Sequence, residues 1–409
     1  MPEKAKAPAI RFKGFTDDWE QRKLGNIAEV TSGLTGDALL PNGKYRLTRI
    51  ETISDGAIDE NKVGYTNMKP DINYLLRCGD ILFSNINSLS HIGKVAIFQG
   101  VSALYHGINL LRIMVNRSIS TPDFIFHQFN TETKRNWAKV HANQAVSQAS
   151  INQTLLAQQV FHICHRSEQA KISEFLSHLE NLITLHHRKF LKLKNVKKAM
   201  LEKMLPKNGS NVPEIRFAGF TDAWEQRKLG EIAKEVNRND PNSTAPIMMI
   251  TANNGFINQS DRYSFNNSGD SLKKYILLKQ NELAYNHGAS KIRPFGSCFT
   301  LPCEEARIPF VYHCFSVGNN DPEFISTELN GSSVESQLRK IISSGARMDG
   351  LLNISFEEYC SVSLMLPDLQ EQIILSHFFK NLDNLITLHQ RKLKKLKNIK
   401  KACLEKMFV

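Results

Sequence analysis

Two stretches of the chain, residues 168–204 and 371–407, place apolar side chains at a regular interval of seven residues. In each stretch a second apolar row follows three residues after the first, and in the first stretch Leu176, Ile183, Phe190 and Met204, one position further on, widen the stripe. No proline or glycine interrupts either run. This pattern, sustained over about five heptads, predicts two long helices with a coiled-coil seam. At ~1.5 Å per residue each helix would be about 55 Å long. Each helix is the natural partner of the other, and we expect them to pair antiparallel.

The core of this helix pair is expected to include Leu179, His186, Leu193, Leu382, His389 and Leu396. The two histidines fall at the middle of their helices, on the same row. A histidine there could bind a metal or respond to pH, but a polar layer in a seam more often fixes register and orientation. We therefore predict a register role for the pair.

The remaining regions, residues 22–165 and 227–367, contain short apolar runs separated by turn residues. The runs Asp80–Ser84, Val95–Phe98 and Glu282–Tyr285 are typical of buried strands. The predicted fold class is therefore α+β, with two tandem mixed α/β domains separated by two long helices that form an antiparallel coiled coil.

The chain is also an internal repeat. Residues 10–28 return at 215–233 with 16 of 19 positions identical, and residues 168–204 return at 371–407 with 24 of 37 positions identical. A chain built this way can form its own pseudo-dimer about a pseudo-two-fold axis. The predicted division is an N-terminal anchoring segment at 1–21, a first domain at 22–165, a central helix at 166–205, a linker and repeated anchoring segment at 206–226, a second domain at 227–367 and a C-terminal helix at 368–409.

The repeated anchoring segments each carry one tryptophan, Trp19 and Trp224, together with phenylalanines. We expect these aromatic side chains to be buried anchors that tie each domain to the helices. A stacking platform for nucleic-acid bases is the less favoured alternative.

The net charge of +12 is concentrated in two places. Residues 186–205 carry +6 and residues 389–409 carry +7, so the rest of the chain sums to −1. A solvated helix face explains one such stripe, but two favour a polyanion or an acidic protein surface nearby.

No long apolar run and no apolar stretch behind the N-terminus occur, so we expect neither a membrane span nor a signal peptide. Seven scattered cysteines suit reduced thiols in the cytoplasm better than a disulfide framework.

Two polar segments in each domain carry residue types that hydrogen-bond base edges and phosphates. Residues 85–94 and 286–296 follow predicted strands, and residues 141–152 and 343–353 precede the long helices. Drift of solvated loops is an equally weighted alternative. The candidate DNA contacts are Asn85, Asn87, Ser88, His91, Lys94, Asn143, Gln144, Ser147, Gln148, Asn286, His287, Ser290, Lys291, Arg293, Arg347 and Asp349.

A search for catalytic motifs finds none. No Gly-x-Gly-x-x-Gly loop, phosphate-binding loop or adenine-methyltransferase motif occurs. Asp123, Glu132 and Lys134 imitate a metal-dependent nuclease site, but Thr121 followed by proline is typical of a helix start. The cysteines near position 300 have poor spacing for zinc. We therefore predict no catalytic residue, no metal and no cofactor in this chain.

The chain resembles the specificity (S) subunits of type I restriction–modification enzymes. The resemblance rests on the phrase Gly-Phe-Thr-Asp-x-Trp-Glu-Gln-Arg-Lys-Leu-Gly, which occurs twice, and on the phrases at 181–189, 384–392 and 367–372. It covers nearly the whole chain. One departure is that the first long helix lacks the proline found before the second.

The resemblance implies that each domain is a target recognition domain, which reads one half of a bipartite, asymmetric DNA target. It also implies that the helices set the spacer between half-sites and dock two modification (methyltransferase) subunits. Motor-nuclease restriction subunits would complete the complex. S-adenosylmethionine, ATP and Mg²⁺ would be bound by these partner subunits, and this chain would catalyse nothing.

Two alternatives stay open at the level of the sequence. One is a nuclease or methyltransferase with an unrecognised active site, which turnover by the purified chain with DNA, Mg²⁺ and S-adenosylmethionine would favour. The other is a purely structural coiled-coil scaffold, which would bind DNA weakly and without selectivity.

Overall fold

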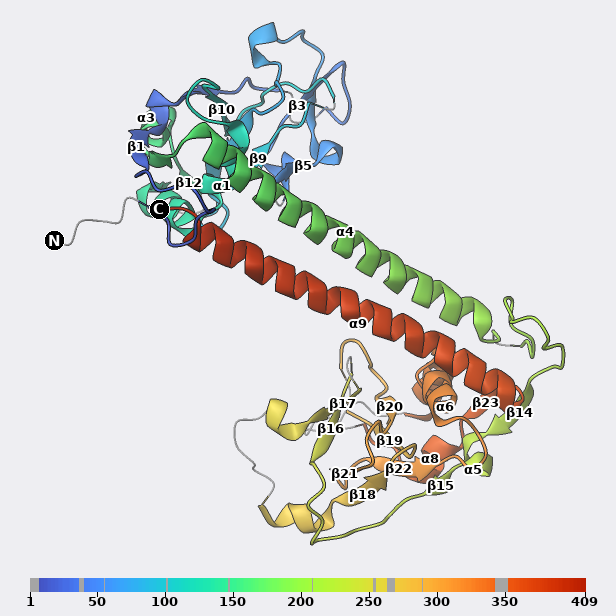
Figure 1. The fold of residues 1–409 in the computed structure, drawn as a ribbon. Helices are drawn as coiled ribbons and strands as arrows, with labels where there is room; N and C mark the ends of the chain where they lie inside the picture. Colours follow the sequence, from blue (N-terminus) through green and yellow to red (C-terminus); the bar gives the residue numbers. More distant parts are fainter. Residues whose placement is uncertain are drawn as a thin grey trace. The chain divides into compact units, whose positions relative to one another are not determined.

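The computed structural model describes residues 7–36, 40–54, 56–100, 102–145, 148–207, 209–252, 255–262, 269–288, 290–342 and 352–409. The chain divides into unit 1, residues 1–188 and 389–409, and unit 2, residues 189–388. These units cut across both long helices (Figure 1), so the domain boundaries predicted from the sequence stay a prediction. Within the described ranges, none of the helices combines the length and the apolar character needed to cross a membrane.

The two predicted long helices are confirmed. Helix α4 spans Arg166–Met204 and helix α9 spans Leu369–Lys406, each without interruption (Figure 1). Asp368 caps α9, because its carboxylate accepts a hydrogen bond from the backbone N–H of Glu371 at 3.0 Å. At the start of α4 His165 takes the capping position: its ring nitrogen Nδ1 accepts from the backbone N–H of Ser167 at 3.4 Å, and its backbone carbonyl accepts from the N–H of Glu168 at 2.9 Å. The first long helix therefore begins at the position equivalent to the second, although no proline precedes it.

Within unit 1 the two helices run antiparallel. Lys400 Nζ lies 2.6 Å from a carboxylate oxygen of Glu180, and His186 Nδ1 lies 2.8 Å from His389 Nδ1. As the residue number rises along α4, the number of its partner in α9 falls, which is the arrangement of antiparallel helices. The histidines contact each other as a half-buried pair. Their role in fixing register stays a prediction.

The spacing of the second apolar row differs from the sequence expectation. In α9, Phe379 and Leu393 are buried, whereas Leu385 and Ile399 are 44% and 37% exposed. The buried row therefore follows the first by four residues and not by three. An α-helix with 3.6 residues per turn buries positions spaced by both three and four, so the sequence pattern alone admitted either row. Leu179 and Leu382 are buried, and Leu193 and Leu396 are half-buried.

Unit 1 is built on a four-stranded antiparallel sheet in the order β2-β10-β7-β9. The described strands of unit 1 as a whole are β1 (Glu20–Lys23), β2 (Ala28–Ser32), β3 (Tyr45–Leu47), β4 (Ile53–Ser54), β5 (Ala57–Ile58), β6 (Gly64–Thr66), β7 (Ile81–Ser84), β8 (Ile86–Asn87), β9 (Val95–Ile97), β10 (Leu110–Val115), β11 (Asn143–Gln144), β12 (Ala149–Ser150) and β13 (Val160–Ile163). Its shorter helices are α1 (Pro122–Phe129), α2 (Glu132–His141) and α3 (Gln153–Ala157).

Unit 2 repeats this plan with the sheet β15-β22-β19-β20. Its strands are β14 (Glu225–Lys228), β15 (Lys234–Glu235), β16 (Met248–Thr251), β17 (Gly255–Asn258), β18 (Ile276–Lys279), β19 (Leu283–Asn286), β20 (Ser297–Thr300), β21 (Glu305–Ile308), β22 (His313–Ser316) and β23 (Ser363–Leu366). Its shorter helices are α5 (Leu229–Ile232), α6 (Pro322–Leu329), α7 (Ser332–Ile341) and α8 (Phe356–Cys360).

The predicted strands near residues 80, 95 and 282 are confirmed as β7, β9 and β19. Successive side chains of a strand point to opposite faces. Ile81 and Phe83 of β7 accordingly join the main core of unit 1, and Leu82 joins a smaller core on the other face. Burial on both faces explains why these strands are continuous apolar runs rather than alternating ones.

The repeated tryptophans are buried anchors, as predicted. Trp19 and Trp224 are each 3% exposed. The ring centroid of Trp19 lies 5.6 Å from that of Phe124 and 6.1 Å from that of Phe408, and Trp224 lies 5.7 Å from Phe324. The anchoring segments therefore pack onto helix α1 in unit 1 and helix α6 in unit 2.

Each anchoring segment is also held by a buried ion pair. Arg11 forms a two-pronged pair with Glu168 at the start of α4, at 2.6 and 2.9 Å. Arg216 forms the same pair with Glu371 at the start of α9, at 2.7 Å for both bonds. The identical positions of these contacts explain why the anchoring segment and the helix start are repeated together.

Candidate nucleic-acid interface

A small antiparallel sheet in unit 1 brings together the two polar segments singled out in the first domain. Its order is β11-β12-β8, and Asn87 pairs with Ala149 while Asn143 pairs with Ser150. Next to this sheet, Asn85 bonds Ile151 through both its backbone carbonyl (2.8 Å) and its side-chain Nδ2 (3.2 Å). Residues about 60 positions apart in the chain thus form one surface.

The loop after β8 is ordered by its own hydrogen bonds. The backbone N–H of Ser88 donates to Asn87 Oδ1 at 2.8 Å, and the hydroxyls of Ser88 and Ser90 lie 2.9 and 3.0 Å from His91 Nδ1. Ser88, His91 and Lys94 are exposed, and Asn87 is half-buried. The loop therefore presents its polar groups to solvent in a fixed arrangement.

Helix α2 supports this loop and leads directly into β11. Gly93 has a φ of +78°, and a Cβ added there would lie 2.6 Å from the side chain of Ala138. A larger residue at position 93 would therefore push the loop away from the helix. Lys139 and Gln144 are exposed along the same path. Gln148, on the other side of the undescribed Ser147, is exposed as well.

Lys134, at the start of α2, does not belong to this exposed surface. Its Nζ donates to the carbonyl of Val160 and lies 4.7 Å from the ring centroid of Phe161. Burial lowers the pKa of Lys134 to about 8. Thr121 caps α1 and Asp123 lies in its first turn, as the sequence predicted for this nuclease-like cluster. Lys134 therefore has a packing role.

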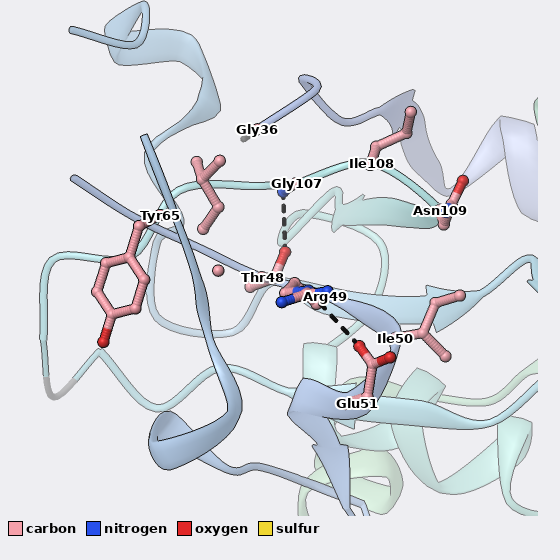
Figure 2. Close-up of a pocket in the computed structure, with 11 residues that line it drawn as sticks. Gly36, Thr48, Arg49, Ile50, Glu51, Tyr65, Gly107, Ile108 and Asn109 are labelled. Atoms are coloured by element: carbon pink, nitrogen blue, oxygen red, sulfur yellow. Dashed lines mark hydrogen bonds and ion pairs between the residues drawn. The ribbon is translucent and has the colours of Figure 1, made fainter. Parts of the chain in front are cut away.

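Two hollows of unit 1 share Ile50 and Glu51 in their lining. The first, shown in Figure 2, is lined by Arg49, Glu51, Tyr65 and Asn109, among others. Its wall is fixed by a hydrogen bond of 2.9 Å from the backbone N–H of Gly107 to Thr48 Oγ1. The second hollow is lined by Glu51 together with the loop. Sequence reasoning missed the segment 49–51, whose only signal is its charged residues.

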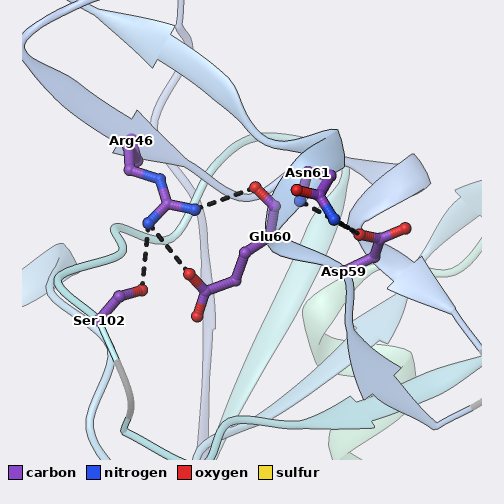
Figure 3. A network of polar contacts seen from close by, with 5 residues as sticks. All are labelled: Arg46, Asp59, Glu60, Asn61 and Ser102. Atoms are coloured by element: carbon purple, nitrogen blue, oxygen red, sulfur yellow. Dashed lines mark hydrogen bonds and ion pairs between the residues drawn. The ribbon is translucent and has the colours of Figure 1, made fainter.

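A polar network braces the neighbouring strands (Figure 3). Arg46 donates from Nη1 to Glu60 Oε2 at 3.0 Å and to Ser102 Oγ at 3.3 Å, and from Nη2 to the backbone carbonyl of Glu60 at 3.0 Å. The side chain of Asp59 accepts from the backbone N–H of Asn61 at 3.1 Å. This network connects the residues after β5 to Ser102 and to β3, which precedes the segment 49–51.

In unit 2 the corresponding loop follows β19. Asn286 Nδ2 donates to the carbonyl of Ile250 at 3.1 Å, and the backbone N–H of Leu352 donates to the carbonyl of His287 at 2.9 Å. The second contact parallels the bond between Ile151 and Asn85 in unit 1. In both units, therefore, a residue near the end of the second polar segment donates a hydrogen bond to the beginning of the first polar segment.

The predicted contacts of this loop differ in exposure. Ser290 and Lys291 are exposed, whereas His287 is 7% exposed. Both ring nitrogens of His287 face carbonyl oxygens, Nδ1 that of Leu352 at 2.8 Å and Nε2 that of Val311 at 2.7 Å. Arg293 donates to the carbonyl of Asn330 at 2.7 Å, and burial lowers its pKa.

Helix α7 supports this loop as α2 supports its counterpart. The guanidinium carbon of Arg339 lies 5.0 Å from the ring centroid of Phe295. Ser147, Arg347 and Asp349 lie outside the described residues. Among the residues that are described, no group of three or more histidine, cysteine, aspartate or glutamate side chains is arranged to hold a metal ion.

Comparisons with known proteins show a similarity over the first part of the chain. Residues 16–195 match the model of the type I restriction modification DNA specificity domain. A putative type I restriction enzyme MjaX specificity subunit of Methanocaldococcus jannaschii is 38% identical over 222 residues. That match covers 52% of each protein, so the chain spans about half the length of this curated relative.

The fold of the whole chain is similar to a solved structure. The crystal structure of the type I restriction–modification system S subunit from M. genitalium aligns with a TM-score of 0.64 at 12% identity, covering 98% of this chain and 99% of that one. At this identity the likeness concerns the fold alone. The family model and the curated relative show that residues 16–195 are similar to the type I restriction modification DNA specificity domain, and that about half of the chain is similar to a type I specificity subunit.

Proposed function

We propose that each unit of this chain reads one half of a bipartite, asymmetric DNA target. The observation that carries this proposal is the surface on which β8, β11 and β12 place two polar segments side by side. Exposed amide, hydroxyl and ammonium groups on a rigid support are suited to base edges and phosphates. The loop of unit 2 has a similar frame but a different sequence, so it should read a different half-site.

The chemistry of the complex belongs to partner subunits in this proposal. S-adenosylmethionine would be bound by modification subunits, and ATP and Mg²⁺ by restriction subunits. The chain itself would contribute double-stranded DNA recognition and the spacer that α4 and α9 set. The separation of reading from chemistry fits a chain without a recognisable catalytic motif.

Docking of two modification subunits is supported by a repeated exposed residue. Leu185 and Leu388 occupy the same place in identical Leu-Ile-Thr-Leu-His phrases and are 46% and 44% exposed. An apolar side chain flanked by basic residues, presented twice, would offer the same partner two equivalent contacts.

Adenine methylation in cells that carry the complete system tests the proposed function. We expect one bipartite motif with two unlike half-sites and a fixed spacer, methylated in both halves on opposite strands. A continuous palindromic motif would contradict the proposal, because unlike recognition units cannot read a palindrome symmetrically.

Substitutions in one unit should alter one half-site only. The pair Asn143→Ala and Gln144→Ala should relax the half-site read by unit 1, and the pair Ser290→Ala and Lys291→Ala the other. Loss of a base contact should cost about 1–3 kcal/mol at one base pair, whereas loss of a phosphate contact should weaken all sequences alike. Sequencing of methylated sites for each pair gives the result. If either pair changes both half-sites, the assignment of one unit to one half-site is wrong.

A further inference from the structure

The second hollow of unit 1 combines one carboxylate with the predicted reading loop. Glu51 reaches it from the short 3-10 helix Ile50–Thr52, and Asn87, His91 and Lys94 reach it from the loop. The side chain of Glu51 is 63% exposed, and its ion pair with Arg49 is long, at 3.8 Å. Its carboxylate is therefore available to a ligand in the hollow.

The other polar groups of the hollow are partly used by the protein. Asn87 donates from Nδ2 to Ser84 Oγ at 3.1 Å and accepts the backbone N–H of Ser88. His91 Nδ1 is engaged by two serine hydroxyls. Lys94 is exposed and makes no ion pair with another described residue. Glu51 and Lys94 thus remain as one acceptor and one donor facing the same space.

A carboxylate on a surface that faces DNA is repelled by phosphates and costs affinity unless it accepts a hydrogen bond from a base. In the major groove only the amino groups of cytosine N4 and adenine N6 can donate to it. A C·G pair presents cytosine N4 as a donor beside guanine O6 and N7 as acceptors, whereas an A·T pair places adenine N6 between single acceptors on either side. Carboxylates typically accept from cytosine N4 and lysines donate to guanine O6 or N7, while adenine is read mainly by asparagine and glutamine, so a carboxylate next to an ammonium group favours C·G.

We propose that the hollow reads a C·G base pair, with Glu51 accepting from cytosine N4 and Lys94 donating to guanine O6 or N7. This inference rests on the proposed function and adds the base pair and the two residues that recognise it. It predicts that both side chains act at the same position of the half-site read by unit 1.

The test uses the assembled complex in cells and maps adenine methylation for variants of the chain. Glu51→Ala should relax one C·G position, lowering its preference over other pairs roughly ten- to hundredfold. Lys94→Ala should relax the same position. Glu51→Gln retains the acceptor oxygen and the side-chain shape, so a smaller relaxation at that position would show that the effect is not misfolding. Glu20→Ala is the control, because Glu20 is an exposed acid of unit 1 that pairs with Arg22 away from the hollow.

The outcomes separate this inference from the proposed function. An unchanged motif in Glu51→Ala, a uniform fall of methylation at all sites, or relaxation at an A·T position would each overturn the C·G assignment while leaving a bipartite motif intact. If the unsubstituted complex shows no bipartite motif, the proposed function itself fails.

Discussion

Replacement of Glu371 by alanine is expected to lower the free energy of unfolding of unit 2 by about 3–5 kcal/mol. The Glu371 side chain is 1% exposed, and its partner Arg216 is 12% exposed. Removing the carboxylate leaves a guanidinium that has lost both of its 2.7 Å bonds in a place with little water. The repeated anchoring segment should detach from the start of α9. Hydrogen exchange of the full chain, followed separately in unit 1 and unit 2, measures the effect.

A matched control lies on the same helix. Asp383 pairs with Lys197 at 2.6 Å, but the two side chains are 53% and 28% exposed. Asp383→Ala should therefore cost less than about 1 kcal/mol, because solvent screens the exposed pair. Combining Glu371→Leu with Arg216→Met should restore most of the lost stability, since no buried charge is then left alone. Equal losses for Glu371→Ala and Asp383→Ala would contradict this account.

The long helices were predictable because their signal is local and repeated. Seven-residue spacing without proline or glycine fixes both the element and its length, and the repeated phrase containing Trp19 and Trp224 indicated buried anchors. The sequence did not show whether the second buried row of α9 would contain Leu385 or the residues spaced four positions after the first row. The choice depends on how the stripe drifts around a helix with 3.6 residues per turn, which the seven-residue row does not specify.

The candidate interface was predictable only in pieces. The sequence identified the loop after β8 and the segment 143–148 as polar, but their meeting depends on a pairing between Asn87 and Ala149, which no local pattern encodes. Glu51 lies in a segment without a periodic signal, and only tertiary packing brings it to the loop. His287 is of a residue type that can contact DNA, yet each of its two ring nitrogens faces a backbone carbonyl oxygen of the protein.

The two units also differ at a buried position of the matching helices α1 and α6. In unit 1, Gln128 bonds strand β13 at His162 twice, donating from Nε2 to its carbonyl at 2.7 Å and accepting from its N–H at 3.2 Å. In unit 2 the same position of α6 is Glu328, which faces Met365 of β23. Burial raises the pKa of Glu328 to about 7, and a hydrogen bond from the Met365 backbone partly opposes this shift. An ionised carboxylate can accept as glutamine does, but it cannot donate.

The stability of unit 2 should therefore fall as the pH rises, and Glu328→Gln should remove that dependence. The pKa of Glu328 is higher in the folded chain than its ordinary value of 4.5. Its contribution is thus fully present below about pH 4.5 and is lost as the pH rises through about 7, by up to about 3 kcal/mol. At pH 8 the variant should be more stable than the original chain by up to that amount, and at pH 5 the two should differ by less than about 1 kcal/mol. Unfolding of the full chain at both pH values, with hydrogen exchange assigned to unit 2, gives the difference in stability between the two proteins. The titration of all other groups cancels in this difference.

Gln128→Glu is the reciprocal control: it should impose the same loss on unit 1 at high pH. Parallel pH profiles for the original chain and Glu328→Gln would show that Glu328 stays ionised in the core, because only the gain of a proton on folding makes the two curves diverge.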